Sequence, residues 1–201
     1  MSHPEAADII GLYERNAEAW ATQRGDVVTE QFALDWLAER LAPGATALDV
    51  GCGSGRPVAR FLLDRGMKVT GVDSSQSLIS AARSDLPSAE WLVADMRTMD
   101  LGRQFDAILA WYSLFHLTPE DQRPMFARFA AHCAPGGLLL FPTGHRHGHL
   151  VGEWLGQPLY HGSLAPEEYR ALLDANGFDV IIERPHEPER GTGITWLARR
   201  R

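Results

Sequence analysis

The stretch Ala47-Leu48-Asp49-Val50-Gly51-Cys52-Gly53-Ser54-Gly55-Arg56-Pro57 predicts how this chain folds. The residues from Thr46 to Val50 form an apolar, partly β-branched run, which is typical of a buried strand. Three glycines at alternate positions follow, and the apolar residues after Pro57 recur at helical spacing. A strand, a glycine turn and a helix in succession let backbone amides come close to a ligand, because glycine has no Cβ and tolerates positive φ.

The glycine pattern differs from the dinucleotide fingerprint G-x-G-x-x-G, since Arg56 stands where the third glycine of that fingerprint would fall. An acid, Asp49, closes the strand before the first glycine. This arrangement resembles the first motif of the class I S-adenosylmethionine-dependent methyltransferases. The resemblance implies that Asp49 helps to hold the ammonium group of that cofactor, and that the turn passes under its methionine part through Gly51, Cys52, Gly53 and Gly55. A purely structural turn is the alternative.

The length, composition and charge of the chain limit the classes of function that it can have. The chain has 201 residues, 45% hydrophobic and 22% charged, so we expect one soluble globular domain with a substantial core. A net charge of −7 argues against a nucleic-acid partner, because a phosphate backbone needs a basic surface. Two cysteines build no disulfide framework, and no apolar run reaches membrane-spanning length. We therefore expect a cytoplasmic protein without a membrane partner, as a monomer or a homodimer.

The N-terminal region is predicted to be helical. Apolar residues from Pro4 to Trp20 recur with helical periodicity, and a second helix is expected from about Val28 to Leu41. Core packing is one interpretation of the aromatic residues in the first helix. The resemblance implies another, in which Tyr13 and Trp20 belong to a lid over the cofactor. Such a lid would exclude water and strengthen the electrostatic interactions beneath it.

A second strand, from Met67 to Asp73, ends in an acid 22 residues after Gly51. In a strand–helix–strand unit this spacing places the Asp73 carboxylate beside the glycine turn, where it can accept both hydroxyls of a ribose. We expect Ser74 to contact the cofactor as well. The alternative is that Asp73 caps the helix that begins near Ser74-Ser75. Dinucleotide-binding proteins also use an acid here, so Asp73 does not separate the two families.

A third short strand, from Ala89 to Ala94, is followed by Asp95-Met96. The resemblance implies that Asp95 receives the adenine amino group and that Met96 packs on the adenine ring. The alternative is that Asp95 caps the turn around Arg97-Thr98.

The fourth strand, from Gln104 to Ala110, runs into Trp111-Tyr112-Ser113-Leu114-Phe115-His116. Ligands of open α/β sheets bind beyond the carboxyl ends of the strands. We therefore expect cofactor contacts from Ala110, Trp111 and Tyr112, and acceptor contacts from Trp111 and His116. The run resembles the fourth motif of small-molecule methyltransferases and lacks the acid-Pro-Pro-Tyr signature of DNA and protein amide methylators. His116 is the candidate general base, because imidazole titrates near neutral pH.

Next along the chain, Thr118 is expected to cap a helix that starts at Pro119 and runs to Cys133, although Pro124 can kink it. A Pro-Gly-Gly turn then precedes a fifth strand from Leu138 to Phe141.

Three alternating histidines, His145, His147 and His149, could together bind zinc. No partner cysteine pair accompanies them, so we expect a solvated loop near the acceptor, with His145 at its mouth, and no metal. The hydrophobic insertion from Gly152 to Gly162 brings Trp154 and Tyr160, which either line the acceptor pocket or pack against the sheet.

Near the C-terminus, a helix from Ala165 to Asn176 precedes two β-rich runs, Phe178 to Glu183 and Gly193 to Arg199, which predict a closing antiparallel hairpin. The element order predicts an α/β fold: a doubly wound, mostly parallel seven-stranded sheet with one antiparallel strand, helices on both faces and an N-terminal helical lid. We expect a single domain over residues 1–201, with a cap (1–43), a cofactor-binding core (44–143) and an acceptor-side insertion with the closing hairpin (144–201).

The resemblance covers Ala45 to Arg199 and implies an S-adenosylmethionine-dependent methyltransferase. Such an enzyme transfers a methyl group to a small-molecule acceptor by in-line displacement and releases S-adenosylhomocysteine. Two alternatives stay open: an NAD(P)-dependent oxidoreductase on a related sheet, and a non-catalytic protein that binds S-adenosylmethionine. The sequence does not identify the acceptor.

Overall fold

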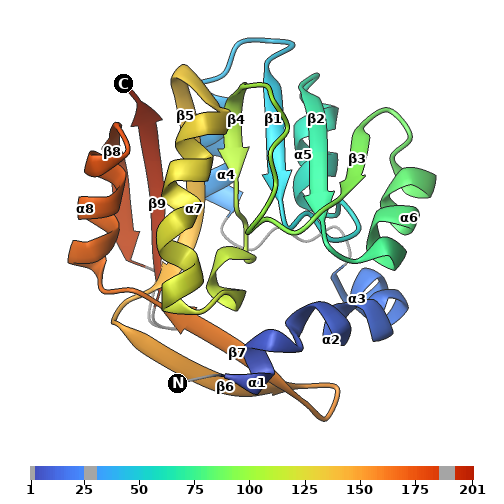
Figure 1. Cartoon of the computed structure of the whole chain (residues 1–201). Helices are drawn as coiled ribbons and strands as arrows, with labels where there is room; N and C mark the ends of the chain where they lie inside the picture. The colour runs from blue at the N-terminus through green and yellow to red at the C-terminus, as the bar shows by residue number, and fades with distance from the viewer. Residues whose placement is uncertain (1–2, 25–30, 186–192) are drawn as a thin grey trace.

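A seven-stranded sheet forms the centre of the computed structural model, which describes residues 3–24, 31–185 and 193–201 (Figure 1). The strand order is β3-β2-β1-β4-β5-β9-β8. Neighbours from β3 to β5 are parallel, whereas β9 is antiparallel to both β5 and β8. This confirms the predicted mostly parallel sheet with one antiparallel strand. The strands are β1 (Thr46–Val50), β2 (Lys68–Asp73), β3 (Glu90–Val93), β4 (Phe105–Leu109), β5 (Cys133–Gly144), β8 (Phe178–Pro185) and β9 (Gly193–Arg200).

Helices cover both faces of the sheet, as the fold class requires. Buried residues of α7 (Pro119–His132) and α8 (Pro166–Ala175) pack into one core cluster. Those of α4 (Gln31–Ala38), α5 (Val58–Asp64) and α6 (Gln76–Asp85) pack into a second cluster. Figure 1 shows α7 and α8 in front of the sheet and α4 and α5 behind it.

The strand order reverses at β1, which pairs with β2 on one side and β4 on the other. Asp49 in β1 lies opposite Gly71 of β2 and Leu109 of β4. Because these strands are parallel, their carboxyl ends meet at one edge, which is the lower edge in Figure 1. Ligand sites of open α/β sheets form at such a reversal.

The N-terminal region forms three short helices, so the prediction of one continuous helix from Pro4 to Trp20 is wrong. Polar side chains between the helices make local hydrogen bonds. Arg15 donates to the Asp8 carboxylate, and the Asn16 side-chain amide donates to the Leu12 carbonyl oxygen at 2.8 Å. Such bonds compete with continuation of a helix. The three helices, together called the lid below, are α1 (Pro4–Ala7), α2 (Ile9–Arg15) and α3 (Ala17–Arg24).

The second predicted helix corresponds to α4, which begins at Gln31 and ends at Ala38. The predicted start near Val28 lies outside the described residues. None of the helices in the described part of the chain is long and apolar enough to cross a membrane.

The insertion after β5 forms a separate two-stranded antiparallel sheet of β6 (Gly148–Trp154) and β7 (Gln157–Ser163). The sequence predicted a hydrophobic insertion here but no strands, because its apolar residues do not alternate with polar ones. Figure 1 shows this hairpin and the lid below the carboxyl ends of the parallel strands.

Two further predictions are confirmed. The Thr118 side chain accepts a hydrogen bond from the Asp121 N–H at 3.2 Å, and α7 starts at Pro119. The helix continues through Pro124 to His132. β8 and β9 form the expected closing antiparallel hairpin. A short 3-10 helix, η1 (Leu114–His116), connects β4 to α7.

Candidate functional site

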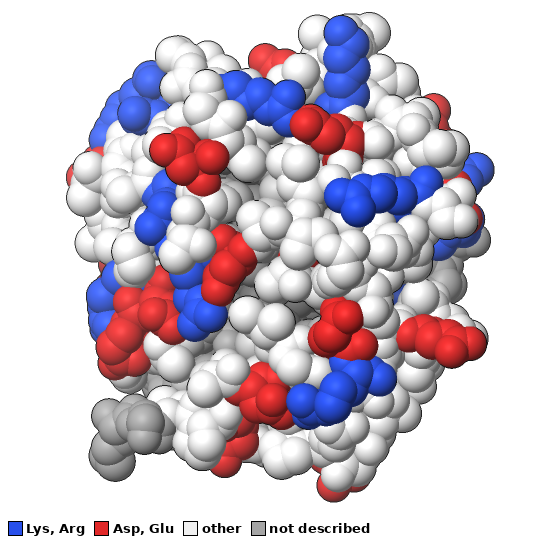
Figure 2. Space-filling model, turned by 45° about the vertical axis from the view of Figure 1, so that its right-hand side comes forward, with Lys and Arg blue, Asp and Glu red and all other residues white. Residues whose placement is uncertain are grey.

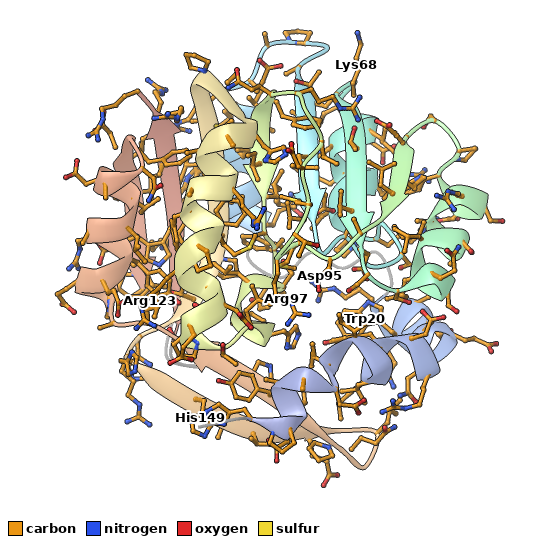
Figure 3. All side chains as sticks on the ribbon, in the orientation of Figure 1. Trp20, Lys68, Asp95, Arg97, Arg123 and His149 are labelled. Atoms are coloured by element: carbon orange, nitrogen blue, oxygen red, sulfur yellow. The ribbon has the colours of Figure 1, made fainter. Side chains whose placement is uncertain are left out.

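A cavity of about 270 Å³ lies between the carboxyl ends of the strands and the lid. Figure 3 shows Asp95 and Arg97 at the sheet side of this region, with Trp20 of the lid below them. The cavity lining includes most of the residues predicted for cofactor contact: Tyr13, Trp20, Asp49, Gly51, Cys52, Gly53, Asp73, Ser74, Asp95, Met96, Trp111 and Tyr112.

The glycine turn is tightly packed against its surroundings. Gly51 has φ +73°, and a Cβ at this position would lie 2.3 Å from the Cβ of Ser113. Ser113 in turn donates a hydrogen bond to the Val50 carbonyl oxygen at 2.6 Å. Gly53 has φ +56°, and a Cβ there would come within 3.0 Å of the Trp20 indole nitrogen. The two glycines therefore leave room that any larger residue would fill.

The amide groups of this turn have partners inside the protein. The N–H groups of Gly51 and Cys52 both donate to the Val72 carbonyl oxygen, at 2.7 and 3.1 Å. The Gly53 N–H donates to the Asp73 carboxylate at 2.8 Å. The turn thus offers a ligand space rather than free amide donors, which corrects the expectation that its amides face the ligand.

Asp73 joins the turn to the start of α6. Besides the Gly53 N–H, its carboxylate accepts the Ser75 N–H at 2.9 Å. Ser75, not Asp73, is the N-cap of α6, because its hydroxyl accepts the Leu78 N–H at 3.1 Å. Burial raises the pKa of Asp73 above its ordinary value, although the N–H groups oppose this. Each carboxylate oxygen retains acceptor capacity toward the cavity.

Asp49 is a buried carboxyl group, only 2% exposed, on the same cavity. Burial, together with the nearby charge of Asp73, raises the pKa of Asp49 to about 7. The guanidinium of Arg24 opposes this rise. Arg24 also lines the cavity, with its guanidinium carbon 5.8 Å from the Trp20 ring centroid and 5.4 Å from that of Tyr112. Two carboxyl groups in one cavity favour a ligand that brings positive charge or hydroxyl donors.

Asp95 and Arg97 form an ion pair at the rim of the cavity. The Arg97 side chain donates to the Asp95 carboxylate at 2.6 Å, and the Arg97 N–H donates to it at 2.9 Å. The turn-capping interpretation of Asp95 therefore holds, and the carboxylate faces the cavity at the same time. Arg97 also lies 3.7 Å from the Asp121 carboxylate at the start of α7.

His116 is held by hydrogen bonds from two other elements. Its Nδ1 lies 2.9 Å from the Tyr160 carbonyl oxygen, and its Nε2 lies 2.9 Å from the Tyr13 hydroxyl. Since a carbonyl only accepts, Nδ1 carries the proton and Nε2 accepts the hydrogen bond from Tyr13. Burial lowers the pKa of His116 to about 4. Burial also raises the pKa of Tyr13 well above its ordinary value, so both groups are neutral at physiological pH.

The comparisons with known proteins agree with this geometry. Residues 47–137 match the model of a methyltransferase domain family. This match spans β1 to the start of β5 and contains the glycine turn, Asp73, Asp95 and His116. This match agrees with the resemblance to the class I S-adenosylmethionine-dependent methyltransferases.

Curated relatives of this chain include two N,N-dimethyltransferases named for amino sugars. The chain is 30% identical over 157 residues to dTDP-4-amino-2,3,4,6-tetradeoxy-D-glucose N,N-dimethyltransferase of Saccharopolyspora spinosa, covering 74% of this chain and 60% of the relative. It is 29% identical over 143 residues to dTDP-3-amino-3,4,6-trideoxy-alpha-D-glucopyranose N,N-dimethyltransferase of Streptomyces venezuelae, covering 70% and 57%. The chain therefore spans about three fifths of the length of these relatives.

Solved structures share the methyltransferase fold over nearly the whole chain. The magnesium protoporphyrin IX methyltransferase of Synechocystis PCC 6803 has a TM-score of 0.77 at 16% identity and covers 100% of this chain and 99% of its own. An amino pentose methyltransferase of Micromonospora echinaspora has a TM-score of 0.71 at 23% identity and covers 92% and 96%.

The remaining predicted residues lie outside the cavity lining. The Cβ position of Gly55 points at Trp91, and the Ala110 N–H donates to Leu140 within the sheet. Tyr160 is fully buried and reaches the site through its carbonyl group. Trp154 stacks on Tyr13 with ring centroids 5.6 Å apart.

The histidine segment also lies apart from the cavity lining. His145 and His147 are exposed between β5 and β6, and His149 stacks on Tyr160. Within the ranges that the structure describes, no group of three or more His, Cys, Asp and Glu side chains is arranged to hold a metal ion. The face of the molecule drawn in Figure 2 carries Lys and Arg side chains interspersed with Asp and Glu.

Three residues in or next to the cavity lining were not predicted: Arg24, Glu14 and Arg97. Arg24 and Glu14 lie on the lid, whose position over the sheet is set by contacts far away in sequence. Arg97 could have been found, because an arginine two residues after Asp95 can reach that carboxylate within the same turn.

Proposed function

We propose that the cavity binds S-adenosylmethionine and that the chain transfers its methyl group to a small-molecule acceptor. The observation that carries the proposal is the pair of carboxyl groups on one cavity beside the glycine turn, the buried Asp49 and the half-buried Asp73. A ligand with a sulfonium and an ammonium charge compensates Asp49, and its ribose hydroxyls donate to Asp73. The space over Gly51 and Gly53 fits the methionine part.

The residues that line the cavity indicate the other cofactor contacts. Asp95 accepts the adenine amino group and Met96 packs on the ring, next to Ser74, Cys52 and the aromatic residues Trp111 and Tyr112. The charge of Arg24 acts on Asp49, and Arg24 lines the same cavity, so it is suited to bind the cofactor carboxylate. The zwitterionic tail of the cofactor is then paired with one residue of each charge. Tyr13 and Trp20 cover the cofactor from the lid.

The same geometry argues against the dinucleotide alternative. A pyrophosphate needs free backbone donors at the glycine turn. Here the N–H groups of Gly51, Cys52 and Gly53 are already bonded to Val72 and Asp73. Two carboxyl groups would also repel a pyrophosphate.

S-adenosylmethionine supplies a methyl group that its sulfonium charge already activates for in-line displacement. The protein therefore mainly needs to align the acceptor, an effect worth roughly 7–11 kcal/mol in favourable cases. His116 at a pKa of about 4 is too weak a base to take a proton from an ammonium group. We assign His116 a positioning role: its Nε2 accepts the hydrogen bond from the Tyr13 hydroxyl. The oxygen of that hydroxyl is then oriented to accept an N–H or O–H of the methyl acceptor.

The acceptor side is formed by the lid, η1 and the β6–β7 hairpin. Trp111 and His116 line it directly, whereas Trp154 and Tyr160 support Tyr13 and His116. Two relatives methylate amino groups of sugar nucleotides. A neutral amine on a small polar molecule is accordingly the first acceptor class to test. In this proposal residues 1–43, 44–143 and 144–201 act as cap, cofactor core and acceptor side of one unit.

Calorimetry tests cofactor binding. We expect S-adenosylmethionine and S-adenosylhomocysteine to bind and NAD to fail, and we expect Asp73→Asn to weaken S-adenosylhomocysteine binding at least about tenfold, because two hydroxyl contacts to a charged group are lost. Asp64→Asn, at an exposed residue of α5, is the matched control and should bind as the native protein does. NAD binding with no binding of either sulfur nucleoside would contradict the proposal. Turnover of an amine acceptor would then exclude the non-catalytic alternative.

A further inference from the structure

Glu14 on α2 reaches across to the first turn of α6. Its carboxylate accepts the Ser75 hydroxyl at 2.6 Å, the Ser77 hydroxyl at 2.6 Å and the Ser77 N–H at 3.2 Å. These hydrogen bonds lower the pKa of Glu14 below its ordinary value, so the group is ionised at neutral pH. A carboxylate at the N-terminus of a helix also interacts favourably with the helix dipole.

The α6 end of this contact belongs to the cofactor site. Ser75 is almost fully buried and lines the cavity, and its N–H donates to Asp73 at 2.9 Å. Asp73 accepts the Gly53 N–H in turn. A continuous chain of hydrogen bonds therefore runs from Glu14 on the lid, through Ser75 and Asp73, to the glycine turn.

The α2 end of this contact carries the lid residue that closes the cavity. Tyr13, the neighbour of Glu14, lines the cavity and bonds to His116 on the opposite side. α2 is thus attached on one side to α6 and on the other to η1. Other side-chain bonds of the lid, from Arg15 to Gln157 and from Trp154 to Gln23, attach it to the β6–β7 hairpin rather than to the ribose side.

We propose that Glu14 is a positioning residue that holds α2 over the bound cofactor and so slows release of the nucleoside product. The role rests on the proposed function, since it requires S-adenosylhomocysteine to occupy the cavity. Glu14 contacts no part of that ligand. It acts by keeping Tyr13 and Ser75 in place around it, so its loss should change the rate of opening more than the rate of entry.

The test is the dissociation rate of S-adenosylhomocysteine, followed by stopped-flow tryptophan fluorescence, since Trp20 lies on the cavity. We expect Glu14→Ala to speed dissociation about tenfold, because three hydrogen bonds to a charged group are lost, with the association rate changed less than about twofold. Glu18→Ala, at an exposed residue of α3 in the same lid, should match the native protein. Circular dichroism and the melting temperature check that each variant is folded.

Ser77→Ala removes the partner instead and leaves the N-cap Ser75 intact. It should speed dissociation less than Glu14→Ala does, and the double variant should be no faster than Glu14→Ala alone, because both changes break the same contact. Native-like dissociation in folded Glu14→Ala, or fully additive effects, would overturn the role of Glu14 while leaving the proposed function intact. Failure of the native protein itself to bind S-adenosylhomocysteine would overturn both.

Discussion

Asp49, which is buried, and Asp73, which is half-buried, lie at the ends of neighbouring strands, and each was predictable because it stands at a fixed distance from the glycine turn. Their protonation was not predictable, because it depends on burial and on their proximity in space. Arg24 and Glu14 carry no motif at all. They enter the site only because the lid folds back over it, so no local pattern in the sequence indicates them.

The raised pKa of Asp49 predicts that cofactor binding depends on pH. Below about pH 7 the group is protonated in the free protein, and a bound cation favours its ionised form, so binding must release a proton. Without ligand, the raised pKa of Asp49 makes the free energy of unfolding fall as the pH rises from 3.8 toward about 7. A bound cation offsets this loss. We expect affinity for S-adenosylmethionine to rise between pH 5.5 and 7, by at most about tenfold per pH unit.

Calorimetry in two buffers of different ionisation enthalpy measures this proton release directly. Asp49→Asn should bind more weakly, and the rise of its affinity with pH should disappear, whereas Asp64→Asn should behave as the native protein does. Equal affinities of the native protein at pH 5.5 and 7, with no proton released, would refute the electrostatic role of Asp49.

At the scale of elements, the strands of the sheet and α7 were predictable, because burial and capping leave local signals. The three lid helices and the β6–β7 hairpin were not. Asn16 opposes continuation of the helix through a side-chain hydrogen bond to the Leu12 carbonyl oxygen, which apolar periodicity does not register. β6 is mostly exposed, and its apolar residues Leu150 and Val151 are adjacent, so the hairpin lacks the alternation that marks a half-buried strand.

The cap of α7 gives a prediction at this scale. The Thr118 hydroxyl accepts the Asp121 N–H, so Thr118→Ala should lower the free energy of unfolding by about 1 kcal/mol. Thr118→Ser keeps the acceptor oxygen and should lose much less. Urea unfolding measures both variants. Equal stability of Thr118→Ala and the native protein would mean that the cap contributes nothing.

At the scale of the whole molecule, the sheet brings the cofactor-binding loops to one edge, and two peripheral segments close over them. Tyr13 and His116 are 103 residues apart in sequence, and Gln23 and Trp154 are 131 apart, yet each pair is hydrogen-bonded. Most residues predicted from the motifs line the cavity on the sheet side. Its cover depends on these long-range contacts, which is why the sequence alone indicated a lid but not its attachments.

The most direct test of the central claim is a crystal structure with S-adenosylhomocysteine at millimolar concentration. We predict that the ribose hydroxyls bind Asp73, that the adenine lies beside Asp95 and Met96, and that the sulfur faces Tyr13 and His116. A nucleoside bound elsewhere, or a cavity that instead takes up a pyridine dinucleotide with its pyrophosphate on the glycine turn, would contradict it.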